Sequence, residues 1–102
     1  MKIYTRFPAI CKNSRDEFIT CIREQMDTGN IIHFKNLFRR YFSMLDPQEW
    51  QKTEKKEEFV GSFRLEYDRS WTPMIEANDR DRQFARFENV LRSGPSMLGW
   101  TN

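Results

Sequence analysis

The segment IIHFKNLFRRYFSMLDP, residues 31–47, carries the strongest periodic pattern in the chain and decides the expected fold. Its large apolar residues recur at the spacing that lines one face of a helix: Phe34, Leu37, Phe38, Tyr41, Phe42 and Leu45. Asn30 directly precedes the segment and is a suitable N-cap. The pattern predicts a helix over residues 31–45 whose apolar face lies in the core.

Three cations of this segment, Lys35, Arg39 and Arg40, lie off the apolar stripe. The segment itself contains no acidic residue before Asp46. If the stripe faces the core, the three cations face solvent. We predict that they form the most positive exposed patch of the protein, bordered by His33. Such a patch suits an acidic partner surface, because the planar guanidinium group binds carboxylates in pairs.

Composition limits the classes of protein that the chain can represent. At 102 residues it is expected to form a single domain over residues 1–102. Aromatic residues make up 15% of the chain, so burial must rely on rings. The formal net charge of +2 excludes both a strongly basic nucleic-acid tail and an acidic DNA mimic. The chain has neither an apolar run of membrane-spanning length nor a signal-peptide pattern, so we expect a soluble, cytoplasmic protein without membrane association.

A second helix is predicted over residues 14–28. Ser14 and Glu17 have the spacing of a capping box, in which the hydroxyl accepts a hydrogen bond from the Glu17 amide. Apolar residues follow at helical spacing, and Gly29 supplies the left-handed residue that commonly ends a helix.

Residues 46–58 are predicted to start and continue another helix. Asp46 and Pro47 suit its first positions, and the charged run over residues 50–58 is typical of a solvated helix that only Trp50 anchors. Residues 59–71 carry two competing patterns, a repeat of aromatic residues every four positions and an alternation typical of a strand. Helix is the favoured prediction for this segment, and strand is the alternative.

The last helix is predicted to open at Thr72-Pro73, or alternatively at Asn78 or Asp79, and to stop at residues 93–95. The tail beyond it has no periodicity. Its apolar residues, among them Trp100, are expected either to fold back onto the core or to form an exposed end.

These patterns predict a mainly α fold, a small single-domain helical bundle of about four helices. Residues 2–7 alternate like a short strand, so an α+β alternative pairs residues 2–7 with residues 62–68 in a two-stranded element. The predicted core consists of Phe18, Ile22, Phe34, Leu37, Phe38, Tyr41, Phe84, Phe87 and Leu91.

The two cysteines, Cys11 and Cys21, are ten residues apart and could close one disulfide. Because a cytosolic protein keeps its thiols reduced, we expect two unpaired structural thiols.

Enzyme signatures are missing from the sequence. His33 is the single histidine, and its apolar neighbours favour a structural role. Cys11, Cys21 and His33 do not have the spacing of a zinc site, and the four glycines form no phosphate loop. We therefore expect no catalytic residue, no metal and no cofactor.

Two classes of binding protein fit the remaining features. The first is a protein-binding regulator or inhibitor that occupies a partner's surface through an aromatic and arginine-rich helical face. The second is a nucleic-acid binder that uses the basic patch around Lys35, Arg39 and Arg40, although no recognised binding motif supports it. The predicted partner-binding residues are Lys35, Arg39, Arg40, His33, Arg80, Arg82, Arg86 and Trp100.

Overall fold

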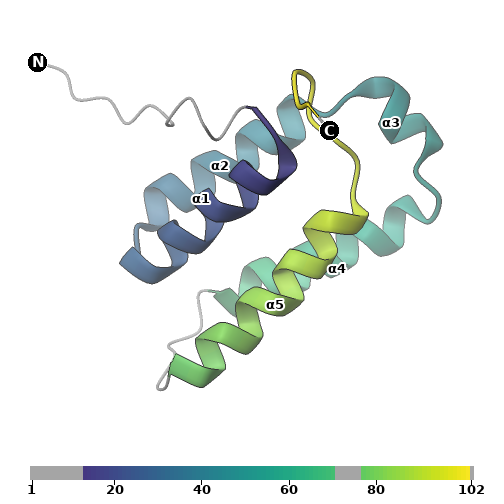
Figure 1. Cartoon of the computed structure of the whole chain (residues 1–102). Helices are drawn as coiled ribbons and strands as arrows, with labels where there is room; N and C mark the ends of the chain where they lie inside the picture. Colours follow the sequence, from purple (N-terminus) through teal and green to yellow (C-terminus); the bar gives the residue numbers. More distant parts are fainter. Residues whose placement is uncertain (1–12, 71–76, 102) are drawn as a thin grey trace, which may run out of the picture. The chain divides into compact units, whose positions relative to one another are not determined.

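A computed structural model describes residues 13–70 and 77–101, which are mainly helical (Figure 1). Its helices are α1 (Arg15–Thr28), α2 (Ile31–Ser43), α3 (Pro47–Lys52), α4 (Lys56–Ser70) and α5 (Ala77–Ser93). The mainly α prediction is confirmed, with one helix more than the predicted number. Residues 62–68 lie inside α4, so the β alternative is wrong for them, and residues 2–7 lie outside the described residues.

The chain divides into two compact units. The first comprises Met1–Asp46 with Ser96–Asn102, and the second comprises Pro47–Pro95. Each unit contains one pair of packed helices, α1 with α2 and α4 with α5 (Figure 1). That residues 1–102 form a single domain stays a prediction.

The α1–α2 pair begins with the caps that the sequence predicts. The Glu17 amide donates to the Ser14 hydroxyl at 3.1 Å, and the His33 amide donates to the Asn30 side chain at 3.1 Å. Gly29 ends α1 at a φ of 68°, in the left-handed region that favours glycine. Each of these signals acts within a few residues of chain, so the sequence alone predicts them.

Rings hold this helical hairpin together. Phe18 of α1 lies 6.3 Å from the Phe38 ring in an edge-on arrangement and is stacked at 5.4 Å on Tyr41. Because the start of α1 contacts the end of α2, the two helices run antiparallel. Such aromatic pairs contribute about 0.5–1.5 kcal/mol beyond their area burial.

The tail that follows α5 folds back onto this hairpin. The Leu98 amide donates to the Met44 carbonyl at 2.7 Å, and the Thr101 amide donates to the Asn13 carbonyl at 2.8 Å. Met97 is only 3% exposed. Of the two expectations for the tail, folding back onto the core is the one that the structure confirms for Met97.

The core predicted from the sequence is confirmed except at Phe84, which is half-buried. Two further residues assigned to the apolar stripe were misplaced, since Phe42 is 39% exposed and Leu45 is half-buried. A helix turns by about 100° per residue, so the six-residue stripe spreads over roughly 140°. Phe42 lies at one edge of that arc, beyond the part that the neighbouring helix covers.

The expectation of two unpaired thiols is wrong for Cys21, which is disulfide-bonded. No cysteine within the described ranges is free. That expectation came from the presumed cellular location, whereas pairing depends on the geometry of the folded chain. Cys11 lies outside the described residues.

In the second unit, α4 and α5 also form an antiparallel pair. The rings of Phe63 and Phe87 meet edge to face at 5.4 Å. Next to them lies a buried polar contact, in which the Gln83 Nε2 donates to the Glu66 carboxylate at 3.0 Å and to the Glu66 backbone carbonyl at 3.2 Å.

The sequence predicts one helix through the charged run over residues 50–58. The structure instead divides this run between α3 and α4, so the prediction is wrong here. α3 ends at Lys52, where the Thr53 hydroxyl donates to the Glu49 carbonyl at 2.7 Å and competes for the backbone. Lys55 then adopts a φ of 56°, and α4 begins at the next residue. The break leaves Trp50 packed against Phe59, with 6.4 Å between the ring centroids.

None of the described helices combines the length and apolar composition that crossing a lipid bilayer requires.

Candidate functional site

One side of α2 combines exposed cations with exposed apolar residues. Ile31 is 50% exposed and Ile32 is 68% exposed, and Lys35, Arg39 and Phe42 are exposed on the same side. By helical geometry these five residues fall within an arc of roughly 100°. We call these five residues the α2 outer face.

The cations of the α2 outer face have no acidic partner in the part of the chain that the structure describes. Within residues 13–70 and 77–101, no acidic side chain forms an ion pair with Lys35 or Arg39. The two residues are four positions apart, so their side chains are neighbours along the helix. Both positive charges are therefore directed at solvent from one short strip.

His33 and Arg40 lie on a different side of α2. Arg40 follows Arg39 by one residue and is turned from it by about 100°. Both His33 and Arg40 are half-buried, whereas Lys35 and Arg39 are exposed. The structure thus separates the predicted patch into an exposed pair and a half-buried pair.

The predicted arginines of α5 differ in their surroundings. Arg82 lies 3.5 Å from the Asp79 carboxylate, and Arg80 is half-buried. Arg86 is exposed. On the same helix Arg92 pairs with Glu88 at 2.9 Å, so the charge of α5 is mixed along its length.

Trp100 packs on the α1–α2 hairpin and is half-buried. Its ring centroid lies 5.4 Å from that of Phe18 and 6.0 Å from that of Tyr41, and the Arg15 guanidinium lies 5.1 Å from it. Burial raises the pKa of the Tyr41 hydroxyl, and the charge of Arg15 lowers it by less. Trp100 therefore contributes to the packing of the first unit.

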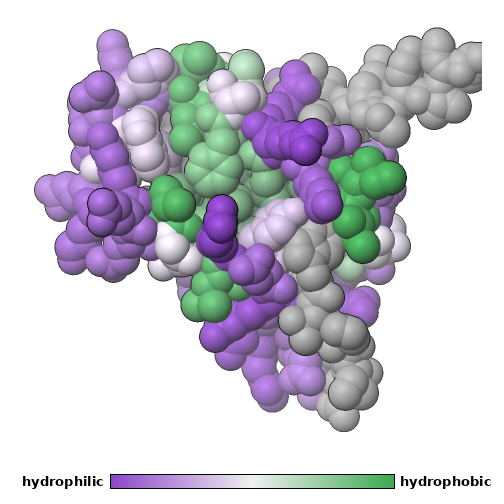
Figure 2. All heavy atoms as spheres, turned by 180° about the vertical axis from the view of Figure 1, so that it is seen from behind, coloured by the Kyte–Doolittle hydropathy of each residue, from purple (hydrophilic) through white to green (hydrophobic). Residues whose placement is uncertain are grey.

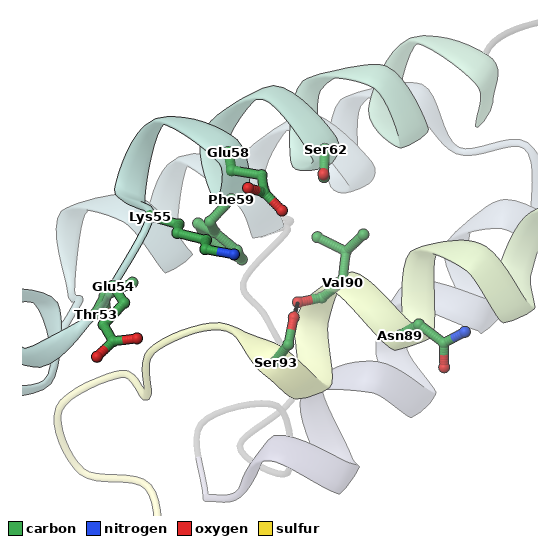
Figure 3. Close-up of a pocket in the computed structure, with 9 residues that line it drawn as sticks. All are labelled: Thr53, Glu54, Lys55, Glu58, Phe59, Ser62, Asn89, Val90 and Ser93. Carbon is green, nitrogen blue, oxygen red and sulfur yellow. Dashed lines mark hydrogen bonds between the residues drawn. The ribbon is translucent and has the colours of Figure 1, made fainter.

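A cavity of about 360 Å³ lies in the second unit, at the break between α3 and α4 (Figure 3). The Lys55 ammonium and the Glu58 carboxylate both point toward it. Its lining consists of Thr53, Glu54, Lys55, Glu58, Phe59, Ser62, Asn89, Val90 and Ser93. This mixed charge indicates no single class of ligand, whereas the α2 outer face presents charge of one sign.

Metal ligands are the other kind of site to consider in the described part of the chain. No group of three or more His, Cys, Asp or Glu side chains is placed there to hold a metal ion.

Sequence reasoning missed the apolar half of the α2 outer face. Phe42 was assigned to the core, and Ile31 and Ile32 were not singled out. Figure 2 shows that hydrophobic areas of the surface are bordered by hydrophilic ones on the face drawn. One available signal was the width of the apolar arc, which exceeds what one neighbouring helix can cover.

Comparison with known proteins shows which proteins this chain resembles in sequence. An uncharacterized protein of Caenorhabditis elegans, C08B11.9, is 46% identical over 90 residues, which cover 82% of this chain and 48% of the relative. The chain thus spans about half the length of that curated relative. No solved structure matches the chain.

A family model described as "Protein of unknown function (DUF2452)" matches residues 17–93. The match contains all of α2, α3, α4 and α5 and most of α1, so it includes the α2 outer face and the cavity but not Trp100. The chain belongs to the DUF2452 family.

Proposed function

We propose that this chain is a non-enzymatic protein-binding regulator or inhibitor that occupies a partner's surface with the α2 outer face. The observation that carries the proposal is that exposed apolar residues share one side of one helix with two exposed cations that pair with no acid among the described residues. In protein interfaces a few buried residues carry most of the binding energy, and complementary charges help to select the partner.

The charge of this face supports an acidic partner. Lys35 and Arg39 meet no carboxylate within the described residues, so forming an ion pair with a partner breaks no existing one. Arg39 adds a planar fork that can bind a carboxylate through two hydrogen bonds. Opposite charges also accelerate association at low salt.

Nucleic-acid binding is the alternative, and it has less support. The α2 outer face carries two cations and one ring, Phe42, that could stack on a base. Its other two residues, Ile31 and Ile32, are aliphatic and neither bind phosphate nor stack on bases. Acidic residues interleave with the arginines of α5 and pair with Arg82 and Arg92. The net charge of +2 adds little non-specific attraction.

A matched pair of double variants tests the proposal. Lys35→Glu with Arg39→Glu reverses the α2 outer face, and Lys52→Glu with Arg64→Glu makes the same change in net charge at exposed positions elsewhere. Each variant and the parent are used to capture proteins from cells of the source organism, followed by quantitative mass spectrometry. Circular dichroism confirms that all three proteins are folded.

We expect one or more proteins to be captured by the parent and by the control variant, and lost from the face variant. Identical captured sets for all three baits would refute the proposal. Fluorescence anisotropy with labelled DNA and RNA covers the alternative, since phosphate binding falls steeply with added salt. Nucleic-acid binding lost only in the face variant, together with unchanged protein capture, would favour the alternative instead.

The proposed location is the cytoplasm. Cytosolic reductants keep most thiols reduced, whereas Cys21 is disulfide-bonded, so trapping of free thiols during lysis tests this location. A disulfide at Cys21 that persists under trapping would argue for an oxidising compartment.

A further inference from the structure

One edge of the α2 outer face, together with the buried Phe38 beside it, has the spacing of a seam that packs a second helix. Ile31, Lys35, Phe38 and Phe42 follow one another at steps of four, three and four, the pattern of the inward positions of a coiled coil. Phe38 is only 4% exposed and forms the base of this stripe, whereas Ile31 and Phe42 are 50% and 39% exposed at its ends. The two ends of the stripe are thus partly exposed to solvent.

The backbone of α2 restricts what can bind there. Beyond the first turn, its amide groups are used within the helix, so from Phe34 onward the face offers a partner mainly side chains. An extended segment bound on it would leave its own backbone groups without partners at the buried contact, whereas a helix satisfies its backbone internally. A helical partner segment is therefore the better fit.

The charges define the partner further. Lys35 and Arg39 lie about 6 Å apart along the axis, and Ile31 and Phe42 lie about 16 Å apart. A partner helix laid along α2 can match both spacings. Two acidic residues four positions apart on the partner would meet the two cations, and an apolar residue on each side of them would meet Ile31 and Phe42. The stripe thus has complementary charge at its centre and apolar contacts at its ends.

We infer, on the basis of the proposed function, that the partner segment is an acidic amphipathic helix that lies along α2. Its carboxylates meet Lys35 and Arg39, and its apolar residues cover Ile31 and Phe42.

Helix α1 of a second copy fits the face less well than such a segment. The outward side of α1 carries the acids Asp16 and Glu24, but Thr20 lies between them and no apolar residue flanks them. Asp27, the next exposed acid, is already paired with Arg23 at 3.2 Å. Self-association is nevertheless measurable and is included as an outcome of the test.

The first experiment uses designed helical peptides as probes and fluorescence polarisation as the readout. One peptide carries two glutamates four positions apart between two leucines, and a second carries lysines in place of the glutamates. We expect the full chain to prefer the acidic peptide by about tenfold. The variant Lys35→Glu with Arg39→Glu should reverse the preference, while Lys52→Glu with Arg64→Glu should keep it. Equal affinity of the parent for both peptides would overturn the inference.

The second experiment separates this inference from the proposed function. Phe42 is replaced by the photo-cross-linker p-benzoylphenylalanine, and the segment cross-linked in lysate is sequenced by mass spectrometry. A segment with acids three or four positions apart, flanked by apolar residues at helical spacing, supports the inference. A segment without that pattern overturns it but leaves the proposed function intact if capture still depends on Lys35 and Arg39.

Two other outcomes also decide the question. A cross-link to a second copy, with a dimer by light scattering that the face variant loses, would make the face a self-interface and overturn the inference. Capture that is independent of Lys35 and Arg39 would remove the proposed function together with the inference.

Discussion

The buried contact between Glu66 and Gln83 gives a sharp test of how α4 and α5 pack. Gln83 is 3% exposed, and its Nε2 donates to Glu66 at both the backbone carbonyl and the carboxylate. The Glu66 side chain also accepts from Arg69 at 3.4 Å, a long contact to a side chain that is 46% exposed. Gln83→Leu removes both of these inter-helix hydrogen bonds and leaves a buried carboxylate with the long contact to Arg69.

We expect Gln83→Leu to lower the free energy of unfolding by about 2–3 kcal/mol, the cost of stranding a buried polar group. Adding Glu66→Leu should recover most of that loss, because apolar groups of similar shape can replace both partners of a buried hydrogen bond. The double-mutant cycle should therefore give a coupling energy of about 1–3 kcal/mol. Urea denaturation followed by circular dichroism measures all four proteins.

Arg69→Met serves as the control, because losing a half-exposed ion pair should cost no more than about 1 kcal/mol. If Gln83→Leu is as stable as the parent, or if the two single losses add in the double variant, then Glu66 and Gln83 do not act as one buried unit. The buried hydrogen bonds between Glu66 and Gln83 would then not contribute to the packing of α4 on α5.

Further variants test the aromatic core of the first unit. Phe38→Ala should lower the free energy of unfolding by about 3–5 kcal/mol, and Phe42→Ala by about 1 kcal/mol or less, in thermal denaturation. Equal losses would contradict the different burial of the two rings. Trp100→Ala should remove about 2–3 kcal/mol, and a loss within ±0.5 kcal/mol would show that the tail is not packed on the hairpin. Because burial raises the pKa of Tyr41, folding favours its protonated form, so stability should fall as the pH rises above about 10. Tyr41→Phe should show a shallower alkaline decline, and superimposable pH profiles would refute this.

Elements with local signals were predictable. The Ser14 cap, the left-handed Gly29 and the Asn30 cap each act within a few residues of chain, so the bounds of α1 and α2 followed from the sequence within about two residues. The break at Lys55 was not predictable, because helix propensity alone continues through residues 50–58. α4 was ambiguous for a different reason, since its aromatic residues satisfy both a helical and an alternating pattern.

The candidate site was predictable in its residue types but not in its grouping. The sequence placed Lys35, Arg39 and Arg40 off the apolar stripe, and helical geometry does so without any tertiary information. Which of them is exposed depends on what packs along each flank of α2. The structure leaves Lys35 and Arg39 exposed and half-buries Arg40.

By itself, the sequence determined the helical class, the caps and the apolar faces, because each follows from chain-local hydrogen bonding and the helical repeat. Only the tertiary structure decided that Phe42 and Ile31 stay exposed, that Trp100 packs on Phe18 and Tyr41, and that the break at Lys55 lines a cavity. The physical reason is that burial depends on the width and position of the neighbouring element. A sequence pattern shows which face of a helix is apolar, but not how much of that face another helix covers.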